Sequence, residues 1–523
     1  MRITLHEIKK IWNFKILLVV AVLCGLFYFM YMDWHVHGAQ AGTSIEAVLL
    51  RELTERYGKR VTAEQMEDFF DEQFPALISE LEYRISLDPI FAEMGIFTYV
   101  DFIRTDRGAE WEEWQILSRM AQPENNRVYA RLQGLHQLQS QWNATPNQIG
   151  MELEMERYGY NSWFSQTLSA ALASNDVPAF VAELRAPILR QADEFIANSR
   201  LFNENGVANY GDFLELWDNL GTFISFEHHN TVWELWRELL RARSGFVERK
   251  LGDLDFLERS YEESPTRAIF EADITRLMDN RAMGEAEITD FAERRIDAII
   301  ENQDHLNLMP WSVFSTTRTY FGWLTILVAL TTLVLVMPLV AVDRMRSIQS
   351  VQYSSKVGRR LMFRQVAAVM LSSLLLTTLL LVIFGAIYFH ETGVHFFWSH
   401  NIFSFTNHFV ALFDFSFGQY VIALAGIAYA VGLAAALLAF IVSRSSRSLI
   451  IAAVKIIPVF AGLTAFAIAL NNSSSAAPFH MTHRLYLWTN IVGIEAIACA
   501  VPVALAFTAA WVVAVREKRV DVG

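Results

Sequence analysis

The chain of 523 residues has only two cysteines, Cys24 and Cys499, and both lie in long apolar runs. The polar part of the chain therefore has no disulfide and must fold around an apolar core of its own. The sequence also lacks the GxxxxGK[ST] phosphate loop, the HExxH zinc motif, a serine nucleophile elbow and paired metal-binding cysteines. We therefore expect no catalytic residues, no bound cofactor and no metal site in this chain.

The sequence contains several apolar runs that are long enough to span a membrane. Hydrophobic residues make up 53% of the chain and charged residues only 19%, which is unusually apolar for a soluble protein of this length. A transmembrane helix needs about 20 apolar residues. Six runs qualify, the last two with one ionisable residue each: 16–32, 320–342, 365–389, 420–442, 449–470 and 487–515. The sequence thus predicts an all-α integral membrane protein with six transmembrane helices.

Basic residues are distributed unevenly among the segments between these runs. Segment 343–364 carries six Lys and Arg residues against one acidic residue, whereas segment 390–419 carries none and segment 471–486 carries only Arg484. If the six runs cross a membrane, the two chain ends, segment 343–364 and the segment between the fourth and fifth runs lie on the same side of it. Together these segments carry fifteen basic residues. Short basic loops face the cytoplasm. We therefore expect both termini in the cytoplasm and residues 33–318 outside it, in a cell membrane.

The resulting domain plan has five parts, and two of them have an alternative interpretation. These parts are 1–15 as a helix at the inner interface, 16–32 as the first span, 33–318 as an extracytoplasmic domain, 319–515 as a five-helix block containing loop 343–364, and 516–523 as a cytoplasmic tail. Residues 1–15 could instead be a disordered basic tail. The first run, followed by Ala39-Gln40-Ala41, could be a cleaved signal peptide, but its length favours a retained anchor.

Residues 33–318 are strongly acidic, with 49 Asp and Glu residues against 26 Lys and Arg residues. Helical spacing of apolar residues dominates, as in 285–300, so a mainly helical domain is expected. A Gly-x5-Asp-Phe spacing occurs three times, beginning at Gly95, Gly206 and Gly284. A helix end followed by a new helix start produces this spacing. We interpret the recurrence as common helix-start chemistry rather than as a duplication.

Two ionisable residues inside predicted spans are candidate functional residues, because a charge near the bilayer centre is costly. Lys455 is close enough to the cytoplasmic end of its span for its ammonium group to reach the inner headgroups. Glu495 lies deeper and indicates a cavity-facing role, with a neutral hydrogen-bonded carboxyl as the alternative. Six histidines in or near the two short outer loops, including His390, His395 and His400, favour scattered polar contacts over a metal or pH-sensing cluster.

Segment 343–364 and the spans beside it resemble the permease subunits of bacterial exporters of the ABC-2 type. In that family an acidic residue ends the second span, a short helix follows, and a Ser/Thr-rich stretch leads to Gly-Arg. Here Asp343, residues 344–351 and the sequence from Ser354 to Arg359 occupy these places. The chain differs at Asp343, where the family often has Glu, and at Arg346-Ser347, where it often has Gly-Thr. The resemblance covers 1–32 and 319–523.

This resemblance implies that loop 343–364 contains a coupling helix that docks on a separate ATPase subunit carrying ATP and Mg²⁺. The residues implied in coupling are Asp343, Arg344, Arg346, Ser347, Ser354, Ser355, Gly358 and Arg359. The arginines could instead bind anionic lipid headgroups. The family also implies a homodimer or heterodimer of permeases in a bacterial plasma membrane, surrounded by membrane lipids and without nucleic acid.

Two other functional classes remain open from the sequence. One is a membrane factor of a secretion system, or a phage-receptor-like protein, without an ATPase. The other is a sensor or resistance module for antimicrobial peptides. The acidic external region suits cationic cargo, but the substrate and the direction of transport are not encoded in any motif of the chain.

Overall fold

A computed structural model of the full chain describes residues 2–38, 42, 44–87, 89–99, 101–102, 123–143, 177–218, 231–232, 235, 254, 290–345, 361–406, 413–473 and 494–519. Within these residues the backbone is mostly helical and forms no β-strand; the one isolated bridge joins Asn401 and Ser416. The predicted all-helical class is therefore confirmed for the part of the chain that the structure describes.

The chain divides into two compact units. The first unit comprises Met1–Arg60, Leu308–Asn407 and Ala411–Gly523, and the second comprises Val61–Asn307 with His408–Val410. The second unit is thus inserted in the sequence between the first two long apolar helices. Its boundaries fall inside the predicted limits of 33 and 318, because the helix that follows the first span groups with the apolar helices.

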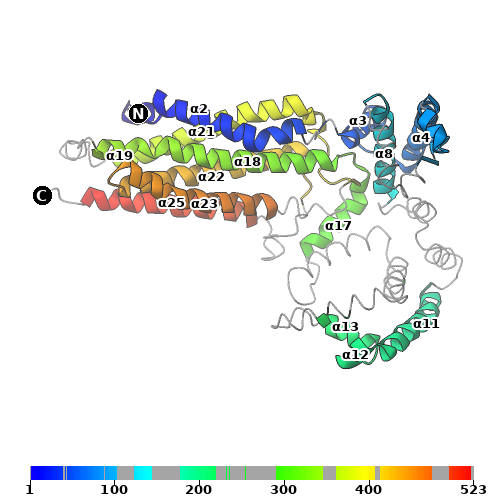
Figure 1. Ribbon diagram of the computed structural model, residues 1–523. Helices are drawn as coiled ribbons and strands as arrows, with labels where there is room; N and C mark the ends of the chain where they lie inside the picture. Colours follow the sequence, from blue (N-terminus) through cyan, green and yellow to red (C-terminus); the bar gives the residue numbers. More distant parts are fainter. Residues whose placement is uncertain are drawn as a thin grey trace. The chain divides into compact units, whose positions relative to one another are not determined.

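Six helices of the described residues are long and apolar enough to cross a membrane, as the sequence predicted. These candidate spans are Phe14–Met32, Trp311–Asp343, Leu361–Thr392, Phe417–Ser445, Leu449–Asn471 and Ala496–Arg516. They comprise α2 (Phe14–Phe27) with the π-helix η1 (Tyr28–Met32), α18 (Trp311–Val336) with α19 (Pro338–Met345), α21 (Leu361–Thr392), α22 (Phe417–Ser445), α23 (Leu449–Ser473) and α25 (Ile494–Arg519). Figure 1 shows them side by side, with both termini at one end.

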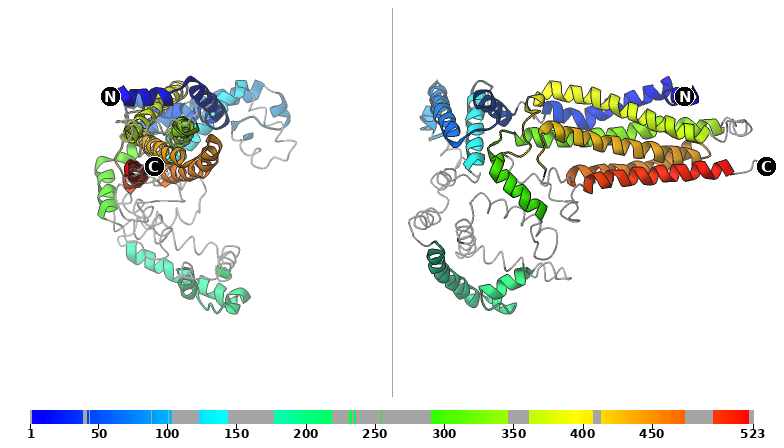
Figure 2. Two further views of the ribbon diagram at one scale, coloured as in Figure 1. Left: turned by 90° about the vertical axis from the view of Figure 1, so that its left-hand side faces the viewer. Right: turned by 180° about the vertical axis from the view of Figure 1, so that it is seen from behind.

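We call that end of the bundle the terminal end; Figure 2 (left) looks along the bundle from it. The opposite end is the Trp311 end. Helix α18 is the most buried of the six spans and packs on α22, α23, α2 and α21. Gly432 of α22 lets α18 and α21 pack closely against α22. A Cβ at this position would lie 2.8 Å from Thr377 Oγ1 of α21 and 3.0 Å from Val328 Cγ1 of α18, too close for a side chain without a shift. In lipid the hydrophobic effect does not drive helices together, so small residues at helix crossings, which allow close van der Waals packing, stabilise the contact instead.

At the Trp311 end, α3 (Ile45–Tyr57) caps the start of α18. The carboxylate of Glu46 accepts hydrogen bonds from the backbone N–H groups of Trp311 at 3.3 Å and Ser312 at 3.2 Å. The first N–H groups of a helix have no partner within the helix, so a carboxylate stabilises that end. Helix α3 also reaches the short segment between α21 and α22 that contains the 3₁₀ helix η7 (Val394–Phe397), where Thr54 Oγ1 lies 3.3 Å from His400 Nε2.

The described helices of the second unit are α4 (Ala63–Leu87), α5 (Pro89–Glu93), α8 (Pro123–Asn143), α11 (Val177–Asn198), α12 (Arg200–Glu204), α13 (Tyr210–Asp218) and α17 (Asp290–Asn302), with the 3₁₀ helix η5 (Asp304–Leu306). Helix α17 confirms the helix expected in 285–300 from residue 290 onward, with Ile296 and Ile299 buried, while 285–289 lie outside the described residues. Arg295 and Asp304, both buried, form an ion pair at 3.2 Å that connects α17 to η5.

Two of the three Gly-x5-Asp-Phe segments have the same local structure, 111 residues apart in the sequence. Gly95 and Gly206 both end a short helix with positive φ angles, 74° and 73°. In each segment the backbone N–H of the residue after the glycine donates a hydrogen bond to the backbone carbonyl oxygen of a buried phenylalanine. Ile96 N donates to Phe91 O at 2.8 Å, and Val207 N donates to Phe202 O at 3.0 Å. The third segment, at Gly284, begins outside the described residues.

The matching extends to long-range contacts. Tyr99 N donates to Glu82 Oε1 at 3.1 Å, and Tyr210 N donates to Asp193 Oδ1 at 2.8 Å, a separation of 17 residues in both cases. The rings of Phe91 and Phe102 meet edge to face, as do those of Phe202 and Phe213. Chance recurrence of a helix start does not reproduce an acidic partner 17 residues upstream. The two segments therefore share a local structure that extends beyond the Gly-x5-Asp-Phe spacing.

Candidate functional site

The amino-terminal segment folds as the helix α1 (Arg2–Ile11), not as an unstructured tail. Its positions 7 and 10 are three residues apart and so lie on one face of the helix. Glu7 on this face is only 2% exposed, and Ile11 is also buried. After α1, the side chain of Asn13 accepts a hydrogen bond from Lys15 N at 3.0 Å and caps α2. A short connection of two residues therefore joins α1 to α2, the helix of the first candidate span.

Glu7, Lys10, Asp343 and Gln365 form a polar cluster at the terminal end of the bundle, which we call the α1 polar cluster. The ammonium of Lys10 lies 3.1 Å from Glu7 Oε1 and 3.3 Å from Asp343 Oδ2. Gln365 Nε2 donates to Glu7 Oε2 at 3.2 Å. Asp343 is 7% exposed and Gln365 2%. The cluster thus joins α1 to α19, which ends the second span, and to α21, which begins the third.

The electrostatics of the cluster hold Lys10 in its charged form. Burial lowers the pKa of Lys10, but the attraction of Glu7 and Asp343 and the hydrogen bonds to them outweigh it. The pKa of Lys10 consequently lies above its usual value. Two carboxylates around one ammonium also mean that removal of Lys10 leaves the buried Glu7 without its cation. Such an uncompensated buried charge is strongly destabilising.

A second interaction fixes the position of α19, which carries Asp343. Helix α18 ends at Val336, and Pro338, which has no N–H, begins α19. Ser443 of α22 is fully buried, and its Oγ accepts hydrogen bonds from Val340 N at 3.2 Å and Ala341 N at 3.0 Å. The side chain of another span therefore caps the amino-terminal end of α19. Asp343 is connected in this way to the first, third and fourth spans.

Of the residues predicted to take part in coupling, the structure places Asp343 in this cluster. Arg344 lies beside it in α19, but its side chain is outside the described residues. The remaining coupling residues all lie outside the described residues: Arg346, Ser347, Ser354, Ser355, Gly358 and Arg359. The structure therefore describes the first residue of segment 343–364, Asp343, and the residue that follows its last, Gln365, together with what these two contact.

Lys455 and Glu495 are both in helices. Lys455 Nζ donates to the carbonyl oxygen of Ser445 at 3.3 Å, at the carboxyl end of α22. This geometry is the one expected of a lysine that extends toward the end of its span, and a cation there also complements the helix dipole. Glu495 lies in the first turn of α25 as described, before the apolar stretch Ala496–Arg516, and its side chain is outside the described residues.

Glu7, Lys10, Gln365 and Ser443 were not predicted as site residues from the sequence. A signal for Glu7 does exist, because it is the only acidic residue among the first 32 residues. An isolated acid in a basic amphipathic helix indicates a buried partner rather than a lipid-facing surface. Gln365 and Ser443 carry no comparable signal, since polar residues at the ends of spans are ordinary.

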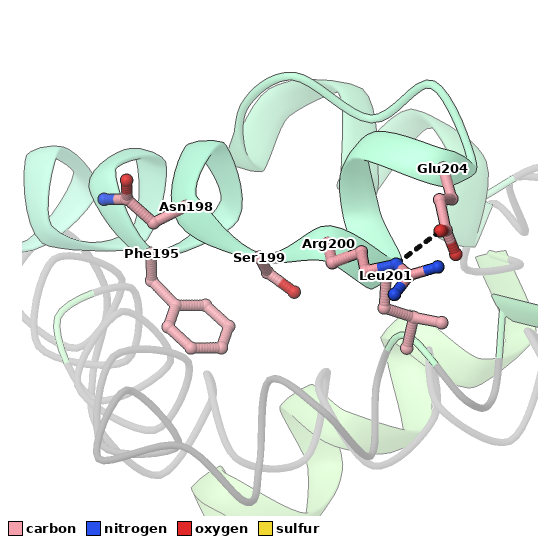
Figure 3. Close-up of a pocket in the computed structure, with 6 residues that line it drawn as sticks. All are labelled: Phe195, Asn198, Ser199, Arg200, Leu201 and Glu204. Carbon is pink, nitrogen blue, oxygen red and sulfur yellow. Dashed lines mark hydrogen bonds and ion pairs between the residues drawn. The ribbon is translucent and has the colours of Figure 1, made fainter.

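The second unit has an open hollow, of about 560 Å³, at the joint between α11 and α12 (Figure 3). Its lining residues are Phe195, Asn198, Ser199, Arg200, Leu201 and Glu204. Arg200 Nε and Glu204 Oε1 pair at 2.6 Å, and Asn198 Nδ2 donates to Glu194 O at 2.7 Å. These charges are exposed and mutually satisfied, so the hollow offers no strong ligand group. Among the described residues no cluster of His, Cys, Asp and Glu could hold a metal ion.

Comparison with known proteins adds no assignment. No protein-family model, no curated protein and no solved structure matches the chain. Any function must therefore be argued from the α1 polar cluster and the six apolar helices themselves.

Proposed function

We propose that the chain is the membrane-spanning permease subunit of an ATP-driven exporter of the ABC-2 type. ATP would be hydrolysed with Mg²⁺ on a separate ATPase subunit, and segment 343–364 would receive the resulting movement on the cytoplasmic side. Residues 33–318 would lie outside the cytoplasm, and two permease chains would form the transport unit. The chain itself would have no catalytic residues.

The observation that carries the proposal is the contact between Asp343 and Lys10. Asp343 begins the basic segment, and Lys10 lies on a helix that continues into the first span. Gln365, just past the other end of the segment, contacts the same helix through Glu7. A force applied between residues 344 and 364 is therefore transmitted at both ends to α1. A loop that only bound lipid headgroups would not need this connection.

The composition of the segment supports a protein partner on the cytoplasmic side. Its six basic residues favour that side, and none of the chain's motifs binds nucleotide. A machine that uses ATP would therefore need a second subunit. Such a subunit would contact the segment that is both accessible to the cytoplasm and connected to the spans.

Co-purification tests the proposal. A tagged full-length chain, expressed in its native host, is expected to retain an ATPase subunit after detergent extraction, identified by mass spectrometry. Arg359→Ala should reduce the retained ATPase at least about tenfold, since one charge-assisted contact supplies about 1.5–3 kcal/mol. Arg484→Ala, predicted to lie on the opposite side of the membrane, serves as the matched control and should retain it fully. If no ATPase is retained, a membrane factor without an ATPase becomes the better assignment.

A further inference from the structure

Arg318 is a buried cation inside a membrane-spanning helix, and the α1 polar cluster does not involve it. It lies two turns into α18, about 10 Å from the Trp311 end at about 1.5 Å per residue. The residue is 6% exposed, and its Nη1 is buried without a hydrogen-bond partner. Among the described residues no carboxylate forms an ion pair with it. Arginine side chains inside spans otherwise pair with an acid or line a functional cavity.

Two further polar side chains with unpaired atoms, Tyr420 and Asn471, pack against the face of α18 that carries Arg318. Phe314, Arg318 and Gly322 are spaced four residues apart and so share one face of the helix. The ring of Tyr420 of α22 stacks on that of Phe314 with 4.8 Å between centroids, one helical turn before Arg318 on the same face of α18. Tyr420 is 1% exposed, and its hydroxyl also has no hydrogen-bond partner.

Asn471 of α23 lies over Gly322, 3.6 Å from the position that a Cβ there would take. Its Nδ2 donates to Ala467 O at 2.9 Å, which fixes the orientation of the amide, while its Oδ1 has no partner. Three helices therefore bring unpaired polar groups to one region of the bundle. Buried polar groups in proteins are nearly always paired, so this region of the bundle is suited to a polar ligand that pairs with all three.

The charge of these groups defines the ligand. Arg318 is permanently cationic and presents its N–H groups in a planar fork that matches a carboxylate or a phosphate. The Tyr420 hydroxyl can donate to the same anion, and Asn471 Oδ1 can accept a hydrogen bond from a hydroxyl or amine next to it. A cation would be repelled by Arg318, and a purely apolar ligand would leave all three groups unpaired.

We propose that Arg318 and Tyr420 form a receptor for one oxyanion group, a carboxylate or phosphate, within the bundle near the Trp311 end. Asn471 contacts a neutral polar group next to that anion. The same chemistry fits the headgroup of an anionic lipid and a small soluble anion. The proposal does not depend on the ATPase subunit, because it concerns this chain alone and the opposite end of the bundle.

Binding to the purified full-length chain in neutral detergent tests the receptor without any ATPase. Microscale thermophoresis with short-chain phosphatidylglycerol, short-chain phosphatidylcholine, sodium phosphate and sodium acetate should give saturable binding for at least one anionic probe. Phosphatidylcholine, whose phosphate is neutralised by its own choline, should bind more weakly. Binding of phosphatidylglycerol alone identifies a lipid headgroup, and binding of phosphate or acetate identifies a free anion.

Arg318→Gln should weaken the binding at least about tenfold, and Tyr420→Phe by a smaller factor. Arg318→Lys keeps the positive charge but loses the planar guanidinium group, so its loss of affinity should lie between those of Arg318→Gln and Tyr420→Phe. Arg447→Gln removes an exposed arginine at the other end of the bundle and is the matched control, with unchanged affinity. The absence of saturable binding for every anionic probe, or equal affinity in Arg318→Gln and the native chain, would overturn the proposal.

Thermal unfolding of the ligand-free protein gives an independent readout. If Arg318 lacks a partner, Arg318→Gln removes an uncompensated charge and should leave the midpoint unchanged or raise it. A saturating anionic probe should raise the midpoint of the native chain and not that of Arg318→Gln. A large loss of stability in ligand-free Arg318→Gln would show that Arg318 already has a structural partner and would contradict the receptor.

Discussion

The ammonium of Lys10 lies 3.3 Å from the carboxylate of Asp343, although 333 residues separate them in the chain. Lys10 also holds Glu7, a carboxylate that is nearly inaccessible to solvent. The amino-terminal helix is therefore joined to the start of the basic segment by a partly buried polar network rather than by apolar contacts alone.

Replacing Lys10 should destabilise the bundle by leaving Glu7 buried without a cation. Lys10→Met is expected to cost about 1–3 kcal/mol, whereas Lys9→Met, at an exposed position on the same helix, should have little effect. Thermal unfolding in detergent, followed by tryptophan fluorescence, measures the difference. Adding Glu7→Gln to Lys10→Met should recover most of the loss, since the neutral amide can still accept from Gln365. If the double variant is as unstable as Lys10→Met, unpaired charge is not the cause.

Ser443 should contribute to stability as the cap of α19. Ser443→Ala leaves the backbone N–H groups of Val340 and Ala341 without their acceptor, at an expected cost of about 1–2 kcal/mol. Ser445→Ala is the matched control, because the hydroxyl of Ser445 is exposed and bonds only to Val442 O within its own helix. Hydrogen exchange of residues 339–345 should quicken in Ser443→Ala alone. Unchanged exchange there would rule out the capping role.

His400 should make the Trp311 end of the bundle sensitive to acid. Burial, with a further contribution from Lys59, lowers the pKa of His400 to about 4. Because the folded pKa is below the unfolded value of about 6.5, the unfolded chain binds the proton first. The contribution of neutral His400 to the free energy of unfolding is fully present above about pH 6.5. It is lost as the pH falls toward 4, by up to about 3 kcal/mol.

His400→Leu removes this titration, so its unfolding midpoint should change less between about pH 7 and pH 4.5 than that of the native chain. The exposed His395 provides the control, and His395→Asn should keep the native pH dependence. Equal pH profiles for the native chain and His400→Leu would show that His400 does not set the acid sensitivity.

The two matching segments of the second unit should respond in the same way to matched substitutions. Asp101 Oδ2 accepts from Phe97 N at 3.3 Å, and Asp212 Oδ2 accepts from Ala208 N at 3.0 Å, in each case from the second residue after the glycine. Asp101→Ala and Asp212→Ala should each speed hydrogen exchange in their own turn by about tenfold or less and leave the other turn unchanged. Glu93→Ala, at an exposed position before the first turn, is the control. Different responses of the two turns would argue against a common structural unit.

The spans could be predicted from the sequence because each is an apolar run of the required length, but their ends could not. The uncharged run predicts a second span from residue 320, yet the helix begins at Trp311 and buries Arg318. Composition does not show whether an arginine near a span faces water or another helix. The same limit hid Ser443, whose role depends on contact with α19, 102 residues away.

The shared structure of the Gly95 and Gly206 segments was visible as a spacing, but the spacing alone could not show how far the likeness extends, because Gly, Asp and Phe recur at many helix starts. Its decisive feature is the acidic partner of Tyr99 and Tyr210, which is Glu82 in one copy and Asp193 in the other. These two residues are chemically equivalent but not identical. Only the hydrogen bonds of the folded chain identify them as a matching pair.

Site-specific crosslinking tests the central claim, that segment 343–364 receives movement from an ATPase subunit. A photoreactive benzoylphenylalanine placed at Ser350, in cells that also express the ATPase subunit identified by co-purification, should give an adduct of this chain with that ATPase. The same photoreactive residue placed at Ser475, in the loop predicted to lie on the opposite side, should give none. An ATPase adduct from Ser350 whose yield changes when ATP is depleted is the predicted result. An adduct from Ser475, or none from Ser350 while the chain is expressed at the native level, would contradict the account.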